Sequence, residues 1–235
     1  FENKLDVSIG IRSDEDTFSN GSKLTNNLSP RLSTSLSISK DRRLKWNSSL
    51  GTYYKTPVYT VLGFKNNLGE FANQDAQYTK SNHFVTGFDY ALGNASKLSM
   101  EVFLKKYDQF PMSVVDGVSL ANKGADFEVL GNENIVTDGK GKTRGLEFLF
   151  QQKLTNNFYE IFSYTFFKSE FTDINGNYLP SVWDSKHLSS FSGGYKLKKN
   201  WEISSRWRFS GKTPYVPYDL DASLANYPNM ILDYS

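Results

Sequence analysis

Short polar turns and long connections alternate strictly along this chain, between segments in which apolar and polar residues alternate. The short turns are residues 39–43, 92–97, 154–157 and 197–200; the long connections are residues 13–27, 55–82, 108–142 and 168–186, with a further one from Gly211. In an antiparallel meander this order places every short turn at one end of the sheet and every long loop at the other. That asymmetry is typical of an outer-membrane β-barrel, which has short periplasmic turns and long extracellular loops.

Nine segments show the period-2 alternation of a β-strand. They lie near Leu5, Leu32, Leu44, Phe84, Leu98, Leu146, Phe158, Leu188 and Ile203. Their length of about 9–11 residues suits a tilted crossing of a bilayer, whereas strands of soluble proteins average about 5–6 residues. We therefore predict an all-β fold, an antiparallel up-and-down transmembrane β-barrel of which this chain supplies about nine strands.

The composition excludes several other classes of protein. Cysteine is absent, so the chain has neither a disulfide scaffold nor a cysteine metal site. The net charge of +2 gives no footprint for nucleic acid, which we do not expect as a partner. No apolar run approaches the roughly 20 residues of a membrane-spanning helix, but barrel strands carry a weaker alternating signal that such a test misses.

Periodicity alone does not say whether the apolar residues face a protein core or lipid. The polar residues of the strands include full charges in mid-strand, which a water-filled lumen accepts, so the apolar residues are expected to face lipid. These charged residues are Glu101, Lys105, Glu147, Arg206 and Arg208. Aromatic residues recur near strand ends, as membrane interfaces require, at Tyr90, Tyr107, Trp201, Trp207 and Phe209. We predict that the five charged residues line the lumen of the barrel.

Several segments, in their order and spacing from Leu28 onwards, resemble the barrel of a TonB-dependent outer-membrane receptor of the kind common in Bacteroidota. They are Tyr53-Tyr54-Lys55-Thr56-Pro57, the strand Glu101–Tyr107, Gly141-Lys142-Thr143-Arg144-Gly145-Leu146-Glu147, Ser163-Tyr164-Thr165 with Trp183–Leu188, and Ser210–Tyr215. The resemblance implies a 22-stranded barrel closed by an N-terminal plug. Residues 1–235 would then form a partial barrel domain that lacks the plug and the final strands. The start at Phe1 and the two unpaired edges that nine strands leave in lipid agree with a segment of a longer protein.

The resemblance also implies a function. The whole receptor would bind and actively import a large or scarce nutrient, such as an iron chelate, vitamin, oligosaccharide or peptide. Its partners would be outer-membrane lipid, TonB through the absent N-terminal region, the nutrient ligand and, in some receptors, a surface lipoprotein. We expect no enzyme activity and no cofactor in this segment.

Two other classes of function fit the sequence less well. One is a non-transport outer-membrane barrel that serves as a structural or assembly subunit for surface lipoproteins or secretion. The other is a soluble all-β glycan-binding protein, which would bury its apolar faces in a core. An outer-membrane enzyme ranks last because no catalytic constellation stands out.

Aromatic residues in the outer loops are the candidate ligand contacts, because aromatic anchors dominate many interfaces. They are Tyr59, Phe64, Phe71, Tyr78, Phe110, Tyr178, Tyr215 and Tyr218.

Three polar groups also invite a chemical interpretation. Asp184 and His187 could form a metal or acid–base pair, although a polar cluster at a loop is the favoured interpretation. Glu101 and Glu147 could form a catalytic carboxylate pair, but we favour lumen charges. Residues 173–177 resemble the start of a calcium loop, yet the glycine comes too early and Asn-Gly favours a turn.

Overall fold

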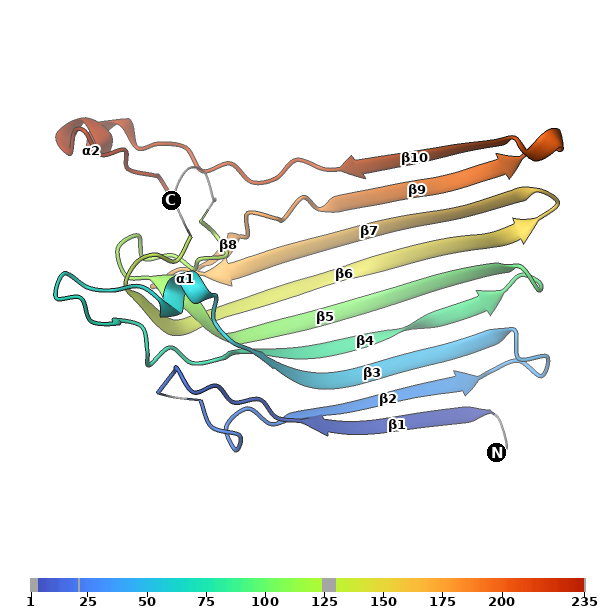
Figure 1. The fold of residues 1–235 in the computed structure, drawn as a ribbon, viewed down its shortest axis with the longest axis horizontal. Helices are drawn as coiled ribbons and strands as arrows, with labels where there is room; N and C mark the ends of the chain where they lie inside the picture. Colours follow the sequence, from blue (N-terminus) through green and yellow to red (C-terminus); the bar gives the residue numbers. More distant parts are fainter. Residues whose placement is uncertain (1–3, 21, 124–129, 235) are drawn as a thin grey trace.

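The computed structural model describes residues 4–20, 22–123 and 130–234, which form one antiparallel sheet of ten strands (Figure 1). The strands are β1 (Leu5–Arg12), β2 (Ser29–Ser37), β3 (Leu44–Lys55), β4 (Thr79–Ala91), β5 (Ser96–Ser113), β6 (Ile135–Thr155), β7 (Phe158–Thr172), β8 (Tyr178–Pro180), β9 (His187–Lys196) and β10 (Glu202–Ser210). Consecutive strands are neighbours from β1 to β7, followed by β9 and β10, and the short β8 pairs with β7. All nine predicted strands are confirmed.

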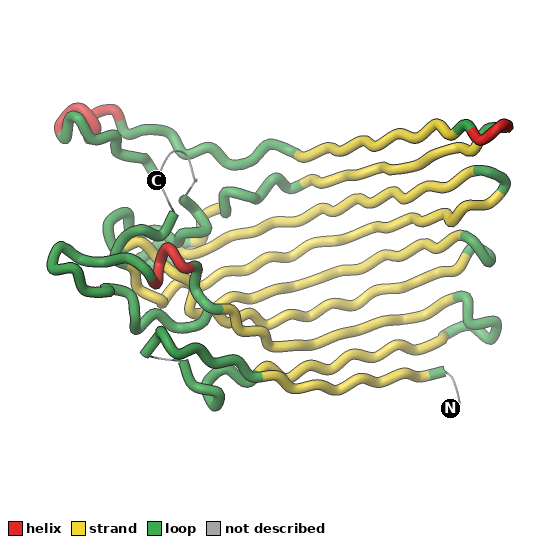
Figure 2. Tube along the Cα trace, viewed as in Figure 1, coloured by secondary structure: helices red, strands yellow, loops and turns green. Residues whose placement is uncertain are grey.

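The two ends of the sheet differ as predicted. The short turns gather at one end and the long loops at the other (Figure 2). The loop end carries the helices α1 (Tyr59–Leu62) and α2 (Leu220–Ala225), and the turn before β10 contains the 3₁₀ helix η1 (Lys198–Asn200). Within the part of the chain that is described, no helix is both long and apolar enough to cross a bilayer.

The prediction of a long connection over residues 108–142 is wrong in its boundaries. β5 has 18 residues and continues to Ser113, and β6 has 21 residues and begins at Ile135. The apolar alternation fades in these extensions, but backbone pairing continues through register shifts between Tyr107 and Met112. Such irregularities bend a strand without ending its sheet. The extensions carry the β5–β6 pair to Ser113 and Ile135, beyond the pairing of β5 with β4, which ends at Asp108.

Cross-strand register places apolar side chains in rows on one surface of the sheet, here called the apolar face. One row runs from Leu5 through Leu36, Trp46, Phe88, Met100, Phe148 and Tyr164. Phe88 and Met100 are each 50% exposed. A soluble barrel would bury such rows in its core, so their exposure favours a face that meets lipid. The opposite surface, here called the polar face, carries Glu101 and Lys105.

The described hydrophobic core is small and lies at the loop end rather than under the sheet. Val61, Leu62, Ala76, Leu120 and Ile135 are buried together there, with Leu130 packed against them. Val61 and Leu62 belong to α1, and Ile135 is the first residue of β6. This cluster joins the loop between β3 and β4 to the loop between β5 and β6.

Candidate functional site

Two rows of side chains cross the polar face close to the loop end. The outer row contains Tyr53, Ser81, Tyr107, Gly141 and Phe171 in consecutive register on β3 to β7. The next row inward contains Arg31, Gly51, His83, Lys105 and Thr143 on β2 to β6. Alternate residues of a strand point to one face, so both rows lie on the same face as Glu101. An aromatic row therefore lies next to a row that contains an arginine, a histidine and a lysine.

Aromatic contacts connect the members of these rows. The ring centroids of Tyr53 and His83 are 4.5 Å apart, and the Arg31 guanidinium carbon lies 4.5 Å from the Tyr53 ring. Phe171 lies 5.2 Å from Tyr107 and 4.5 Å from Phe110 between ring centroids. Such arrangements fix ring orientations, and each adds about 0.5–1.5 kcal/mol beyond burial.

Trp183 extends the aromatic wall from the loop after β8. Its ring centroid lies 5.7 Å from that of Phe171, and its indole nitrogen donates to Ser169 Oγ at 3.1 Å. The neighbouring Asp184 is buried and accepts a hydrogen bond from the Ser169 backbone nitrogen at 2.9 Å. Asp184 thus anchors the loop that presents Trp183, which is itself 46% exposed.

A cavity of about 490 Å³ lies beside these aromatic residues, at the loop end of the sheet. Its lining consists of Tyr53, Tyr54, Lys55, Thr56, Pro57, Val58, Thr79, Ser81, His83, Tyr107, Phe110, Pro111, Leu120, Ala121, Leu130 and Trp183. The volume falls within the range of about 300–1,000 Å³ that is usual for small-molecule sites, and a mainly apolar lining with a few polar groups is also usual. This cavity is the candidate ligand site.

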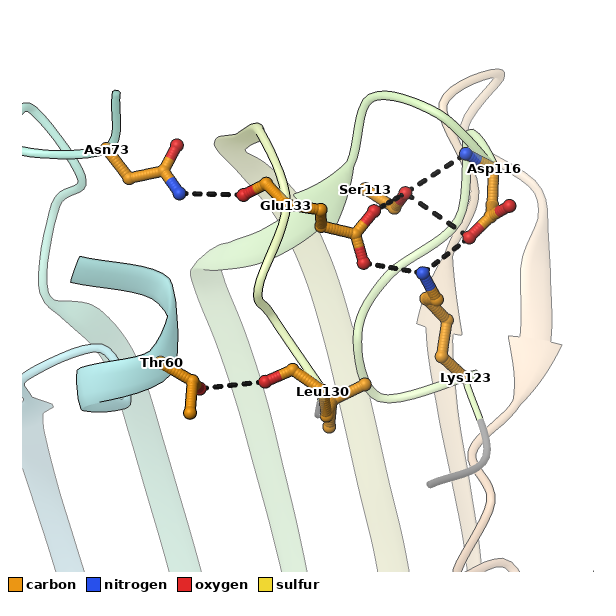
Figure 3. A network of polar contacts seen from close by, with 7 residues as sticks. All are labelled: Thr60, Asn73, Ser113, Asp116, Lys123, Leu130 and Glu133. Atoms are coloured by element: carbon orange, nitrogen blue, oxygen red, sulfur yellow. Dashed lines mark hydrogen bonds and ion pairs between the residues drawn. The ribbon is translucent and has the colours of Figure 1, made fainter. Parts of the chain in front are cut away.

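The cavity is roofed by a cap, defined here as residues 56–78, 114–123 and 130–134. Its segments are tied by polar contacts that Figure 3 shows. Thr60 Oγ1 donates to the Leu130 carbonyl at 2.7 Å, and Asn73 Nδ2 donates to the carbonyl of Glu133 at 2.8 Å. Buried Asn73 also donates to the Val61 carbonyl at 2.9 Å. One amide side chain therefore joins α1 to the segment that enters β6.

Lys123 links the two ends of the loop between β5 and β6 by ion pairs. Its Nζ lies 2.5 Å from Asp116 Oδ2 and 2.5 Å from Glu133 Oε1, and Ser113 Oγ donates to the same Glu133 carboxylate (Figure 3). Burial lowers the pKa of Lys123, but the hydrogen bonds that it donates to Asp116 and Glu133 outweigh burial, so the pKa lies above the usual value. The lysine therefore stays charged and holds the two carboxylates together.

Among the eight aromatic residues predicted as ligand contacts, Phe110 is the one that lines this cavity, and it lies in β5 rather than in a loop. Tyr78 is buried, and its hydroxyl donates to Asp16 Oδ2 at 2.7 Å. Phe71 packs against Phe18, and Tyr178, in β8, lies under the Lys142 ammonium group. Tyr59, Phe64, Tyr215 and Tyr218 lie elsewhere at the loop end, with Tyr59 and Tyr215 strongly exposed. Ligand contact by these residues stays a prediction.

The predicted lumen residues Glu101, Lys105, Glu147, Arg206 and Arg208 all fall on the polar face by register. Their place in the lumen of a closed barrel stays a prediction. Lys105 lies next to the cavity, directly opposite His83. Tyr107, predicted as a membrane-interface residue, is instead on the polar face and lines the cavity. Its parity within β5, shared with Glu101 and Lys105, is the sequence signal that could have placed it.

Asp184 and His187 do not form a pair. Asp184 bonds the Ser169 backbone, whereas His187 Nδ1 lies 2.8 Å from the hydroxyl of Tyr164 on the apolar face. Residues 173–177 form a turn as favoured, with Asn177 donating twice to the Asp173 carboxylate at 2.7 and 3.0 Å. Among the described residues, no group of three or more His, Asp or Glu side chains could hold a metal ion.

An antiparallel meander with one exposed apolar face, one polar face and long loops at a single end is the wall of an outer-membrane β-barrel. The chain belongs to the TonB-dependent receptor family, because the family model described as TonB dependent receptor-like, beta-barrel, matches residues 1–233. It is therefore an outer-membrane protein of a transporter and receptor family. Comparison with curated protein sequences gave no match.

Solved structures of several receptors share the fold. The pyoverdine outer membrane receptor FpvA from Pseudomonas aeruginosa PAO1 bound to pyoverdine matches with a TM-score of 0.65 at 15% identity, over 94% of this chain and 31% of the receptor. FpvA bound to heterologous pyoverdines matches with a TM-score of 0.65 at 14% identity, over 99% of this chain and 28% of that one. The FrpB iron transporter from Neisseria meningitidis matches with a TM-score of 0.54 at 15% identity, over 80% and 27%. The chain thus spans about a third or less of the structures that it matches.

Proposed function

We propose that the intact receptor binds an anionic metal chelate of the ferric-siderophore class in the cavity under the cap and imports it across the outer membrane. Energy would come from TonB. The observation that carries this proposal is the pairing of an aromatic row with a cationic row on the polar face. Membership of the family supports the transport step.

The chemistry of the two rows selects the ligand class. Arg31 and Lys105 would attract negative charge, and the Arg31 guanidinium is already oriented by its contact with the Tyr53 ring. Tyr107 and Trp183 offer ring faces and edges for planar, aromatic or apolar parts of a ligand. A ferric chelate with catecholate groups combines a compact shape, negative charge and planar aromatic groups, whereas a ferric tris-hydroxamate is compact but neutral at its metal centre. A neutral oligosaccharide would use the aromatic row but gain little from the cations.

The solved relatives support the same class. Two of the matched structures hold FpvA with pyoverdines, another is described as an iron transporter, and a further match is the copper transporter OprC. These similarities concern the fold, so the identity of the metal and of the chelator is left to experiment. Docking of a surface lipoprotein and an origin in Bacteroidota stay predictions from the sequence.

The test is a binding titration on the intact receptor in detergent. A panel of ferric catecholate, ferric hydroxamate and neutral oligosaccharide ligands is added, and affinity is measured by calorimetry. We expect a ferric chelate to bind, Tyr107→Ala to weaken it by about tenfold to a hundredfold, and Lys105→Gln to weaken anionic more than neutral chelates. Lys153→Gln, at the turn end of β6, is the matched control and should bind as the wild type does.

Two outcomes would overturn the proposal. One is binding of the oligosaccharide but of no ferric chelate. The other is chelate binding that Tyr107→Ala and Lys105→Gln leave unchanged, because the ligand would then occupy another part of the receptor.

A further inference from the structure

Four cations form a cluster on the apolar face, at its loop-end border. Lys106 of β5 lies directly opposite Lys142 of β6, and Arg144 of β6 lies directly opposite Lys168 of β7. Lys106 follows Val102 and Leu104 at two-residue steps, and Lys168 follows Phe166, so these cations continue the apolar face. We call Lys106, Lys142, Arg144 and Lys168 the basic cluster.

Like charges directly opposite each other in a sheet are destabilising. The basic cluster contains two such pairs, on three adjacent strands, and one carboxylate among them. Glu170 Oε1 lies 2.8 Å from Lys168 Nζ, and its Oε2 lies 3.7 Å from Lys142 Nζ. Neither Lys106 nor Arg144 forms an ion pair with another described residue, and both are exposed. By contrast, Lys80 of the adjacent strand β4 faces Asp108, a pair of opposite charge. The cluster thus holds four cations against the single carboxylate of Glu170, an excess of positive charge.

The position of the cluster relative to the apolar rows indicates its environment. Arg144 and Lys168 lie in the same cross-strand row as Leu50, Phe84 and Leu104. Leu104 is 37% exposed and Phe84 is 41% exposed, as a lipid-facing row requires. Apolar side chains and cations thus meet in one row at the loop end. In an outer-membrane barrel the loop end is extracellular, so the cluster lies where the hydrocarbon of the outer leaflet meets its headgroups.

We propose that the basic cluster binds the phosphate groups of a phosphorylated glycolipid in the outer leaflet. Phosphate oxygens accept charge-assisted hydrogen bonds from lysine and bidentate ones from arginine, and basic clusters at membrane level attract anionic headgroups. A bound phosphate between the two like-charged pairs would neutralise their repulsion. The surface is on the opposite face of the sheet from the cavity, so this proposal does not depend on the ligand that is imported.

The experiment measures thermal stability of the intact, delipidated receptor in detergent. Three additions are compared: bisphosphorylated lipid A, the same lipid after enzymatic removal of its phosphates, and inorganic phosphate. Phosphorylated lipid is expected to raise Tm by about 3 °C or more through binding to the folded state. The dephosphorylated lipid and inorganic phosphate are expected to raise it far less.

The double variant Lys106→Gln/Arg144→Gln separates the proposal from a general loss of stability. Without lipid its Tm should equal or exceed that of the wild type, because one member of each like-charged pair is gone. With phosphorylated lipid its rise in Tm should be lost. The matched variant Lys153→Gln/Lys198→Gln removes two exposed cations at the turn end and should keep the full rise. Equal stabilisation by the dephosphorylated lipid, or a full rise in Lys106→Gln/Arg144→Gln, would overturn the proposal and assign the lipid contact to sugars or acyl chains.

Discussion

Glu101 of β5 and Glu147 of β6 lie directly opposite each other on the polar face of the sheet. A like-charged pair in this position costs stability relative to a neutral pair. Asp89 on β4 adds a further carboxylate nearby, although it pairs with Lys97 Nζ at 2.9 Å. The middle of the polar face is therefore acidic, whereas the row that contains Lys105 is basic.

Replacing one of these carboxylates should stabilise the barrel wall. Glu147→Gln is expected to raise the free energy of unfolding by about 0.2–1 kcal/mol, because it removes the repulsion and keeps the shape of the side chain. The denaturant midpoint of the intact receptor measures the change. Glu202→Gln is the control, since Glu202 accepts a hydrogen bond from the Tyr159 hydroxyl at 2.6 Å and should not stabilise. A marked loss of stability in Glu147→Gln would show instead that a cation from another part of the receptor bridges the two carboxylates.

The cap should depend on Lys123. Lys123→Gln leaves Asp116 and Glu133 close together without their shared cation, and the expected cost is about 1–3 kcal/mol of local stability. Proteolysis within residues 114–123 and 130–134 should therefore become faster in the intact receptor, while Lys123→Arg should retain much of the protection. Lys65→Gln, on an exposed part of the cap, is the control. Unchanged cleavage in Lys123→Gln would mean that the Asn73 contacts hold the cap alone.

The pH dependence of the cap follows from the same lysine. The pKa of Lys123 is above its ordinary value of 10.5, so its charge stabilises the folded cap fully below that value and is lost as pH rises through the folded pKa. Resistance of residues 114–123 and 130–134 to a protease active in alkali should stay constant from about pH 7 to 9 and fall only above the ordinary lysine pKa. A fall near neutral pH would contradict this assignment.

The wall of this protein was predictable from sequence because a period of two and the alternation of connection lengths are local signals. The end of β5 was not, because Phe110 and Met112 pair with β6 through register shifts that no pattern marks. The cavity was missed for a related reason. Tyr53 and Tyr107 belong to different strands, and only the cross-strand register shows that Tyr53, Ser81 and Tyr107 share one row. Trp183 reaches that wall through Ser169 and Asp184, which are contacts between loop and strand that spacing does not reveal.

The loop between β1 and β2 should withstand acid because of Asp16. Burial raises the pKa of Asp16, but hydrogen bonds from Ser19, Tyr78 and Phe18 outweigh it and hold the pKa well below the ordinary 3.8. A depressed pKa gives stability that is present above the ordinary value and lost only as pH falls towards the folded pKa. Asp16→Asn should therefore speed amide exchange at Phe18 and Ser19 at neutral pH, whereas the wild-type protein should keep that protection at about pH 4. Loss of protection in the wild-type protein already at about pH 5 would contradict the hydrogen-bonded carboxylate.

Gly141 should be required for the aromatic wall of the cavity. A Cβ at this position would collide with the ring of Phe171, against which Tyr107 packs. Gly141→Ala is expected to cost about 1–3 kcal/mol of stability through overpacking, and to weaken binding of the ferric chelate because Phe171 would move. Gly10→Ala is the matched control. Gly10 is also a strand glycine on the polar face, but a Cβ added there would have no atom within 4 Å. Denaturant midpoint and calorimetric affinity are measured together. If stability falls while affinity is unchanged, the position of Phe171 does not affect ligand binding. If stability and affinity fall together, the packing of β6 against β7 contributes to ligand recognition.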